Sequence, residues 1–185
     1  TRAAELSLTI TVLGTAARPL ERTAARPGDA LYVTGTLGGP GAALDALLRG
    51  AAPRDADRAR FAAPSPRLAE ARWLAERGAH AAIDLSDGLV ADAGHLAAAS
   101  GVRIALDLAA LPCVDGVSPE SAAASGEEYE LLVAVRADAP LDTAAFRARF
   151  GIPLTVIGRV VAGRGVSLEG SAARVDLPSG YDHLS

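Results

Sequence analysis

Short apolar segments typical of β-strands alternate along the chain with alanine-rich segments typical of helices, and this alternation constrains the fold most strongly. Hydrophobic periodicity predicts strands at residues 6–13, 30–34, 81–84, 102–106, 130–135 and 154–160, and helices at residues 42–49, 67–77, 88–99 and 143–150. Interleaved strands and helices bury their apolar faces by stacking helices on a sheet. The sequence therefore predicts an α/β (α+β layered) fold with helices packed on a mixed β-sheet.

Composition excludes several classes of function. The 185 residues are 50% hydrophobic but only 4% aromatic, which is enough apolar mass for a core without disulfides or metals. All 18 basic residues are arginine, so the chain contains neither a Schiff-base lysine nor a P-loop lysine. The net charge of −4 argues against a nucleic-acid-binding surface, which would be basic.

Cysteine usage and hydropathy indicate a cytoplasmic protein that does not interact with membranes. Cys113 is the one cysteine and cannot form an internal disulfide. No apolar run approaches the roughly 18 residues of a membrane span, and no basic-then-apolar leader opens the chain. The sequence begins at Thr1 and has no methionine, so we expect it to be part of a longer protein.

A group of oxygen-bearing side chains marks the junction between the strand at 81–84 and the helix at 88–99. Asp84, Ser86 and Asp87 fall within four residues, and Asp84 and Ser86 project to the same side of an extended segment. Such hard oxygen ligands suit Mg²⁺. The alternative interpretation, in which Ser86 or Asp87 only caps the following helix, is equally compatible with the spacing.

Two further segments have both a functional and a structural interpretation. The acidic run at 127–130 could bind a cation or a cationic substrate, although a solvated acidic turn is the commoner use of such a run. The glycine-rich loop at 35–41 could hold a phosphate on backbone N–H groups. It matches neither nucleotide-binding fingerprint, so a tight structural turn is favoured.

Several motifs together resemble the thiamine-monophosphate kinase family, in the same order and with similar spacing. They are Arg26-Pro27-Gly28-Asp29, Tyr32-Val33-Thr34-Gly35, Pro64-Ser65-Pro66-Arg67, Asp84-Leu85-Ser86-Asp87-Gly88-Leu89, Gly126-Glu127-Glu128-Tyr129-Glu130-Leu131 and Gly180-Tyr181-Asp182-His183. The resemblance covers essentially the whole chain. Glu128 stands where the family usually has aspartate, and Leu184 where it usually has phenylalanine.

The resemblance implies a domain organisation of the aminoimidazole ribonucleotide synthetase-like superfamily. Its members combine an N-terminal ATP-binding domain with a C-terminal α/β domain and usually form homodimers through the N-terminal sheets. Residues 1–25 would then be the last strand of the N-terminal domain plus a linker, and residues 26–185 the C-terminal domain. Most of the metal ligands would lie in the preceding half, so we expect this chain to be inactive alone.

The resemblance also implies an activity, the transfer of the γ-phosphoryl group of Mg-ATP to thiamine monophosphate, with thiamine diphosphate and ADP as products. Asp84 and Asp87 match Mg²⁺ ligands of the family. Ser86 and Arg22 match contacts to ATP, which serves as co-substrate. The family places no catalytic nucleophile on the protein, because the phosphate of the substrate attacks directly.

On the substrate side, Glu127 and Tyr181 match contacts to thiamine monophosphate. The thiazolium ring is cationic, so a carboxylate and an aromatic face are suitable partners for it. Two alternatives remain open at this stage. One is another ATP-dependent synthetase of the same superfamily, with an amide or selenide acceptor, and the other is a non-catalytic binding or assembly module.

Overall fold

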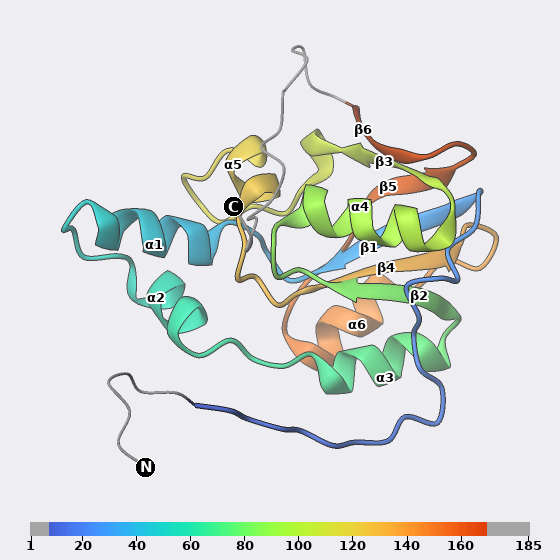
Figure 1. The fold of residues 1–185 in the computed structure, drawn as a ribbon, viewed down its shortest axis with the longest axis horizontal. Helices are drawn as coiled ribbons and strands as arrows, with labels where there is room; N and C mark the ends of the chain where they lie inside the picture. Colours follow the sequence, from blue (N-terminus) through green and yellow to red (C-terminus); the bar gives the residue numbers. More distant parts are fainter. Residues whose placement is uncertain (1–7, 170–185) are drawn as a thin grey trace.

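One mixed sheet organises the part of the chain, residues 8–169, that the computed structural model describes (Figure 1). Its strands are β1 (Asp29–Thr34), β2 (Ala79–Asp84), β3 (Arg103–Asp107), β4 (Leu131–Arg136), β5 (Leu154–Val161) and β6 (Gly165–Glu169). They lie in the order β2-β4-β1-β5-β3-β6. All neighbouring pairs are antiparallel except β3 and β6, which are parallel. The predicted mixed sheet is therefore confirmed.

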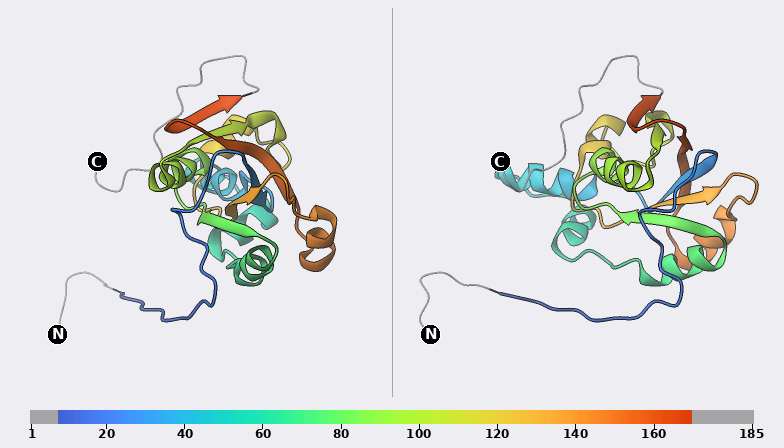
Figure 2. Two further views of the ribbon diagram at one scale, coloured as in Figure 1. Left: turned by 90° about the vertical axis from the view of Figure 1, so that its right-hand side faces the viewer. Right: turned by 45° about the vertical axis from the view of Figure 1, so that its right-hand side comes forward.

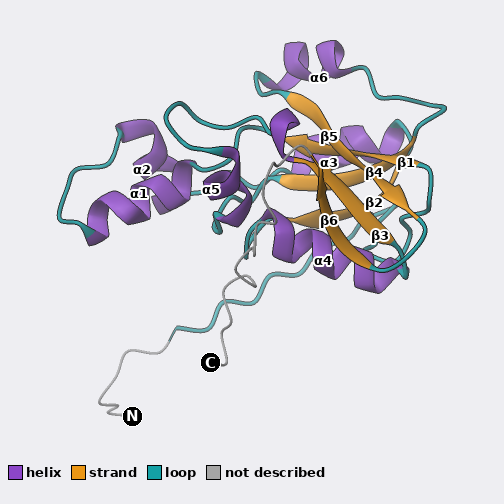
Figure 3. Cartoon of the chain, turned by 90° about the horizontal axis from the view of Figure 1, so that it is seen from above, coloured by secondary structure: helices purple, strands orange, loops and turns teal. Residues whose placement is uncertain are grey.

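Helices cover both faces of this sheet. They are α1 (Gly39–Leu48), α2 (Asp55–Ala62), α3 (Leu68–Glu76), α4 (Leu89–Ser100), α5 (Pro119–Ala124) and α6 (Thr143–Phe150), with a short 3₁₀ turn at Leu108–Ala110. Helix α4 packs on one face, while α3 and α6 lie on the other (Figure 3). Helices α1, α2 and α5 form a group beside the sheet, in contact with one another through α1. The predicted layered fold is thus present.

Alternate residues of the central strands supply two separate cores. Leu31 and Val33 of β1 belong to the core beneath α4, whereas Tyr32 between them packs with Trp73 of α3 and Phe146 of α6. Successive strand residues point to opposite faces of a sheet. Because both faces are covered, β1 is apolar at its four central positions, residues 30–33, rather than alternating between apolar and polar.

The strand predicted at residues 6–13 is not formed where the structure describes it. Residues 1–7 lie outside the described part, and residues 8–13 pair with no strand within that part. Their side chains are largely exposed, with Ile10 at 87%. This segment runs away from the sheet (Figure 2). An alternating apolar pattern forms a strand only beside a neighbour that accepts its hydrogen bonds. Within residues 8–169 no strand of the sheet lies beside this segment.

Among residues 8–169, none of the helices combines the length and hydropathy that crossing a bilayer requires.

The aromatic cluster beneath α3 and α6 should contribute strongly to stability. Phe146 is fully buried, and its ring centroid lies 5.4 Å from that of Trp73. We expect Phe146→Ala to lower the free energy of unfolding by about 3–5 kcal/mol, because it leaves a cavity in a close-packed core. Urea denaturation followed by tryptophan fluorescence measures the change. Leu48→Ala, at a position 77% exposed on α1, is the control and should cost about 0.5 kcal/mol or less. Equal losses in the two variants would contradict this assignment of the core.

Candidate functional site

The candidate site lies where β2 ends and β4 begins. Asp84, the last residue of β2, pairs with Leu131, the first residue of β4. The chain continues beyond these strands as two loops, which we call the junction loop (residues 85–88) and the glutamate loop (residues 126–130). The amide of Leu85 donates a hydrogen bond of 2.9 Å to the carbonyl of Glu130. Pairing therefore extends from the sheet into both loops.

Two more backbone hydrogen bonds fasten the glutamate loop to the junction loop. The amide of Tyr129 donates to the carbonyl of Leu85, and the amide of Glu127 to that of Ser86, each over 2.8 Å. Glu127 and Tyr129 have positive φ angles of 61° and 49°, which non-glycine residues rarely adopt. A Cβ at Gly126 would lie 2.8 Å from the Ser86 carbonyl oxygen, so glycine is required for this close approach.

Acidic side chains from the two loops gather around Tyr129. Its phenol donates to Oε2 of Glu127 over 3.3 Å. Burial raises the pKa of Tyr129, and the negative charges of Glu127, Asp84 and Asp87 raise it further. Arg22 brings a positive charge, with Nη2 3.8 Å from Oδ1 of Asp84. Both partners of that ion pair are about half exposed, so the pair is weak and open to competition by ligands.

The junction loop is held from beneath by α4. Ser86 donates from Oγ to Oδ1 of Asp87 over 3.1 Å, and the Asp87 amide donates to Oδ2 of Asp92 over 3.0 Å. Burial raises the pKa of Asp92, although the hydrogen bond from the Asp87 amide opposes that effect. Gly88 is the N-cap of α4, and no side chain caps the helix there. The interpretation of Ser86 or Asp87 as a helix cap is therefore wrong.

These groups offer oxygen ligands to a metal ion in two arrangements. Asp84, Asp87 and Glu127 form the acidic cluster around Tyr129. Asp87 also approaches Asp92 and His95, and ligand atoms of these three residues lie within 4.8 Å of one another. Mg²⁺ prefers oxygen ligands and is usually held by one or two carboxylates together with water and substrate phosphates. The carboxylates of Asp84 and Asp87 fit that chemistry better than a set that includes histidine.

The other side chains of the glutamate loop point into the protein. Glu128 and Glu130 are 4% and 1% exposed, so the interpretation as a solvated acidic turn is wrong for these two residues, while Glu127 is exposed. Glu128 accepts hydrogen bonds from the Gly38 amide (2.6 Å), the Ser125 hydroxyl (2.7 Å) and Arg60 Nη2 (2.9 Å). The Gly38 amide of the glycine-rich loop therefore already donates to the carboxylate of Glu128 rather than to a phosphate. The structural interpretation of that loop is the one the contacts support.

The structure brings most of the predicted site residues into one region. Those linked by the contacts above are Arg22, Asp84, Ser86, Asp87 and Glu127. Tyr181 lies outside the described residues. Sequence reasoning gave no role to Tyr129 or Asp92. The signals for them were an aromatic residue within the acidic run and a single acid on the apolar face of a helix.

Comparison with known proteins shows which family and which solved structures the chain resembles. Residues 26–171 match the family model described as AIR synthase related protein, C-terminal domain. The thiamine-monophosphate kinase of Escherichia coli is 38% identical over 97% of this chain and 60% of its own length. That of Methanopyrus kandleri is 39% identical over 89% of this chain and 54% of its own length. The chain thus spans about 60% or less of the length of these relatives.

Solved structures agree with these sequence matches. The thiamine-monophosphate kinase of Stenotrophomonas maltophilia has a TM-score of 0.77 and 35% identity, over 85% of this chain and 55% of that chain. A structure described as AaThiL complexed with AMPPCP and TMP has a TM-score of 0.75 and 33% identity, over 90% of this chain and 54% of that chain. Escherichia coli HypE, a hydrogenase maturation protein, has a TM-score of 0.68 and 25% identity, over 86% of this chain and 52% of that chain.

Glu128 should give the protein a distinctive dependence of stability on pH. Burial raises the pKa of Glu128, so the folded state holds this proton more tightly than the unfolded state. The free energy of unfolding should therefore fall as the pH rises from about 4.5 through the raised pKa. Glu128→Gln should lack this component. Urea denaturation across a pH series measures it.

The control for this measurement is Glu76→Gln, at an exposed position on α3, which should keep the pH dependence of the unmodified protein. If Glu128→Gln kept the same decline with pH, the buried carboxylate would not be its source.

Proposed function

The chain belongs to the AIR synthase related protein family, whose C-terminal domain its residues 26–171 match, and we propose that it is the C-terminal part of a thiamine-monophosphate kinase. The complete enzyme would transfer the γ-phosphoryl group of Mg-ATP to thiamine monophosphate, giving thiamine diphosphate and ADP. The observation that carries the proposal is the union of the junction loop and the glutamate loop, which gathers Asp84, Asp87 and Glu127. The names of the relatives and the AMPPCP and TMP of one solved relative support it.

The proposal includes the organisation of the complete protein. Residues 1–25 would be the last strand of an N-terminal ATP-binding domain with its linker, and residues 26–185 the C-terminal domain. The complete protein would be a cytoplasmic homodimer. This organisation is supported by the resemblance to the family. It is also supported by the greater length of the relatives, since this chain spans about 60% or less of their length.

Asp84 and Asp87 would hold Mg²⁺, since both contribute carboxylates to the acidic cluster. When bound, the ion would neutralise phosphate charge and orient the phosphoryl group for transfer. The carboxylate of Asp92 accepts a hydrogen bond from the backbone amide of Asp87 and so fixes the junction loop. The carboxylate of Asp87 therefore projects from a loop that is held in place. A braced ligand loses less conformational freedom when a metal binds.

Arg22 and Ser86 would contact ATP on the same side of the site. Arg22 is about half exposed, and its guanidinium can make paired hydrogen bonds to phosphate oxygens. The present ion pair of Arg22 with Asp84 would then exchange for contacts to phosphate and metal. Ser86 offers a hydroxyl beside Asp87, within the same loop.

Glu127 would recognise the cationic thiazolium of thiamine monophosphate. The carboxylates around it make this region negative, which attracts a cation by simple Coulomb interaction. The phenol of Tyr129 donates to Glu127 and so orients its carboxylate. Tyr181, outside the described residues, would supply an aromatic face, a contact worth about 0.5–2 kcal/mol with a cation.

No protein nucleophile is needed for the transfer. An oxygen of the substrate phosphate forms the new P–O bond to the γ-phosphorus, and the bond from that phosphorus to the bridging oxygen of ADP breaks. Phosphoryl transfer depends chiefly on alignment and charge neutralisation. The absence of lysine from this chain is compatible with such a mechanism.

The activity is tested by ADP release from Mg-ATP in the presence of thiamine monophosphate. The assay compares the chain alone with the chain joined to an N-terminal half of the kind its relatives possess. We expect ADP release that depends on thiamine monophosphate in the joined protein and none from the chain alone. A folded joined protein that binds ATP but does not phosphorylate thiamine monophosphate would contradict the proposal.

Asp84→Asn should separate the metal role from folding. We expect ADP release by the joined protein to fall roughly 100-fold or more, as when one preorganised electrostatic group is removed from an active site. Melting temperature should change little, because the Asp84 side chain is half exposed. Asp138→Asn, which removes an exposed partner of Arg136 at the far end of β4, is the control and should keep full activity. Undiminished turnover in Asp84→Asn would rule out its role as a metal ligand.

A further inference from the structure

Alternate side chains of the glutamate loop point to opposite sides. Glu127 belongs to the acidic cluster around Tyr129, whereas Glu128 and Glu130 are buried beneath it. The position of Glu127 therefore depends on how firmly its two buried neighbours are held. Burying a carboxylate is costly unless it is paired and hydrogen-bonded. The partners of these buried carboxylates decide which conformation the loop adopts.

Glu130 is held from two directions. Arg67 donates to its carboxylate from Nε (2.9 Å) and Nη2 (2.6 Å), a two-pronged contact that fixes both oxygens. The hydroxyl of Thr34 donates to Oε2 over 2.6 Å and accepts from the amide of Leu131 over 2.9 Å. A Cβ at Gly35 would lie 2.2 Å from Oε1 of Glu130, so the carboxylate fills the space above a glycine. These contacts restrict the Glu130 side chain to essentially one conformation.

Arg60 holds Glu128 in a similar way. Its Nη2 donates to Oε2 of Glu128 over 2.9 Å and also lies 3.5 Å from Glu130, while Nη1 donates to the carbonyl of Thr36 over 2.7 Å. One guanidinium thus ties the glutamate loop to the backbone of the glycine-rich loop. Because arginine presents several donors in a rigid fork, lysine would not reproduce these contacts.

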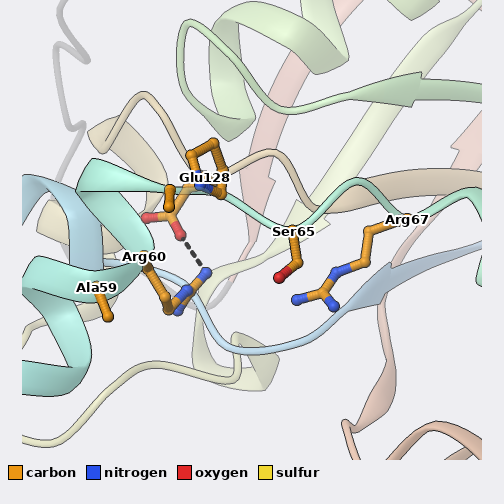
Figure 4. Close-up of a pocket in the computed structure, with 7 residues that line it drawn as sticks. Ala59, Arg60, Ser65, Arg67 and Glu128 are labelled. Atoms are coloured by element: carbon orange, nitrogen blue, oxygen red, sulfur yellow. Dashed lines mark hydrogen bonds and ion pairs between the residues drawn. The ribbon is translucent and has the colours of Figure 1, made fainter.

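The two arginines border a small pocket of about 150 Å³ between α2 and the start of α3, with Ser65 between them (Figure 4). The pocket suggests an anion site, but its charges argue otherwise. Glu70, Glu128 and Glu130 already accept hydrogen bonds from the two guanidinium groups. Three carboxylates around two guanidiniums disfavour a further anion. The arginines therefore serve the glutamate loop rather than a ligand of their own.

The backbone of the loop needs such support. Glu127 and Tyr129 occupy the left-handed region, a conformation that persists in non-glycine residues only when surrounding contacts enforce it. The contacts that enforce it are the two backbone hydrogen bonds to the junction loop and the buried pairs of Glu128 and Glu130. If the buried pairs were lost, the loop would relax, and the amides of Glu127 and Tyr129 would separate from their acceptors.

We infer that Arg60 and Arg67 are positioning residues, which act through Glu128 and Glu130 to hold the glutamate loop so that Glu127 faces the substrate. This inference rests on the proposed function for the role of Glu127. The mechanical part, the fixing of the loop, rests on the contacts alone. The two parts can therefore be tested separately.

Hydrogen exchange of individual backbone amides, followed by NMR, tests the mechanical part in the 185-residue chain. In Arg67→Met we expect the amides of Glu127 and Tyr129 to exchange roughly tenfold faster or more, because exchange reports local opening. The amide of Val133, in the middle of β4, should keep its protection. Arg136→Met removes an exposed ion pair at the other end of β4 and should leave both loop amides unchanged.

A double variant guards against misfolding. Arg67→Met leaves Glu130 buried with one partner fewer, whereas Arg67→Met combined with Glu130→Gln removes both charges together. We expect this double variant to fold and still to exchange Glu127 and Tyr129 rapidly. Unchanged exchange of these two amides in a folded variant would overturn the inference.

Substrate kinetics test the second part in the joined protein. Arg67→Met and the double variant should raise the KM for thiamine monophosphate roughly tenfold while changing the KM for ATP little. Arg22 lies outside the glutamate loop, and the junction loop that carries Ser86 keeps its hydrogen bond to Asp92. A general loss of folding would change both. If the unmodified joined protein did not use thiamine monophosphate at all, the proposed function would be wrong, and the exchange result would still decide the positioning role.

Discussion

Backbone pairing between the junction loop and the glutamate loop is the constraint on which the site depends. Hydrogen bonds from Leu85, Glu127 and Tyr129 continue the β2–β4 ladder past the ends of the strands. Segments far apart in sequence are thereby fixed edge to edge, and their acidic side chains share one small region. A sheet can bring loops together in this way because the strands beneath them are rigid and covered on both faces.

The buried carboxylates of the glutamate loop select its conformation rather than add to the stability of the fold. The pKa of Glu128 is raised by burial even though Arg60, Ser125 and Gly38 surround it with donors. Its ionised form is therefore less favourable in the folded protein than in water. Buried ion pairs often contribute little net stability, and in some proteins they select one conformation among several. In this chain the selected conformation is the one that turns Glu127 toward the site.

Much of the fold could be predicted from local patterns, because strand and helix periodicities reflect burial. The strand ending at Asp84 and the helix after Gly88 appear where the sequence indicates. Long-range relations could not be predicted. Nothing local to Glu128 shows that Gly38 will donate to it, or that its neighbours will face the opposite way. Helix α5 was missed although Ser118, its N-cap, precedes a proline at the first helical position, a recognisable start signal.

The most direct test of this account is a titration of the chain with thiamine monophosphate in the presence of Mg²⁺, followed through backbone amide chemical shifts. The account predicts that residues 84–88 and 126–129 shift together and saturate at one ligand concentration, because the paired loops form one site. Shifts confined to other surfaces, such as the pocket beside Ser65, would contradict it, as would independent responses of the two loops.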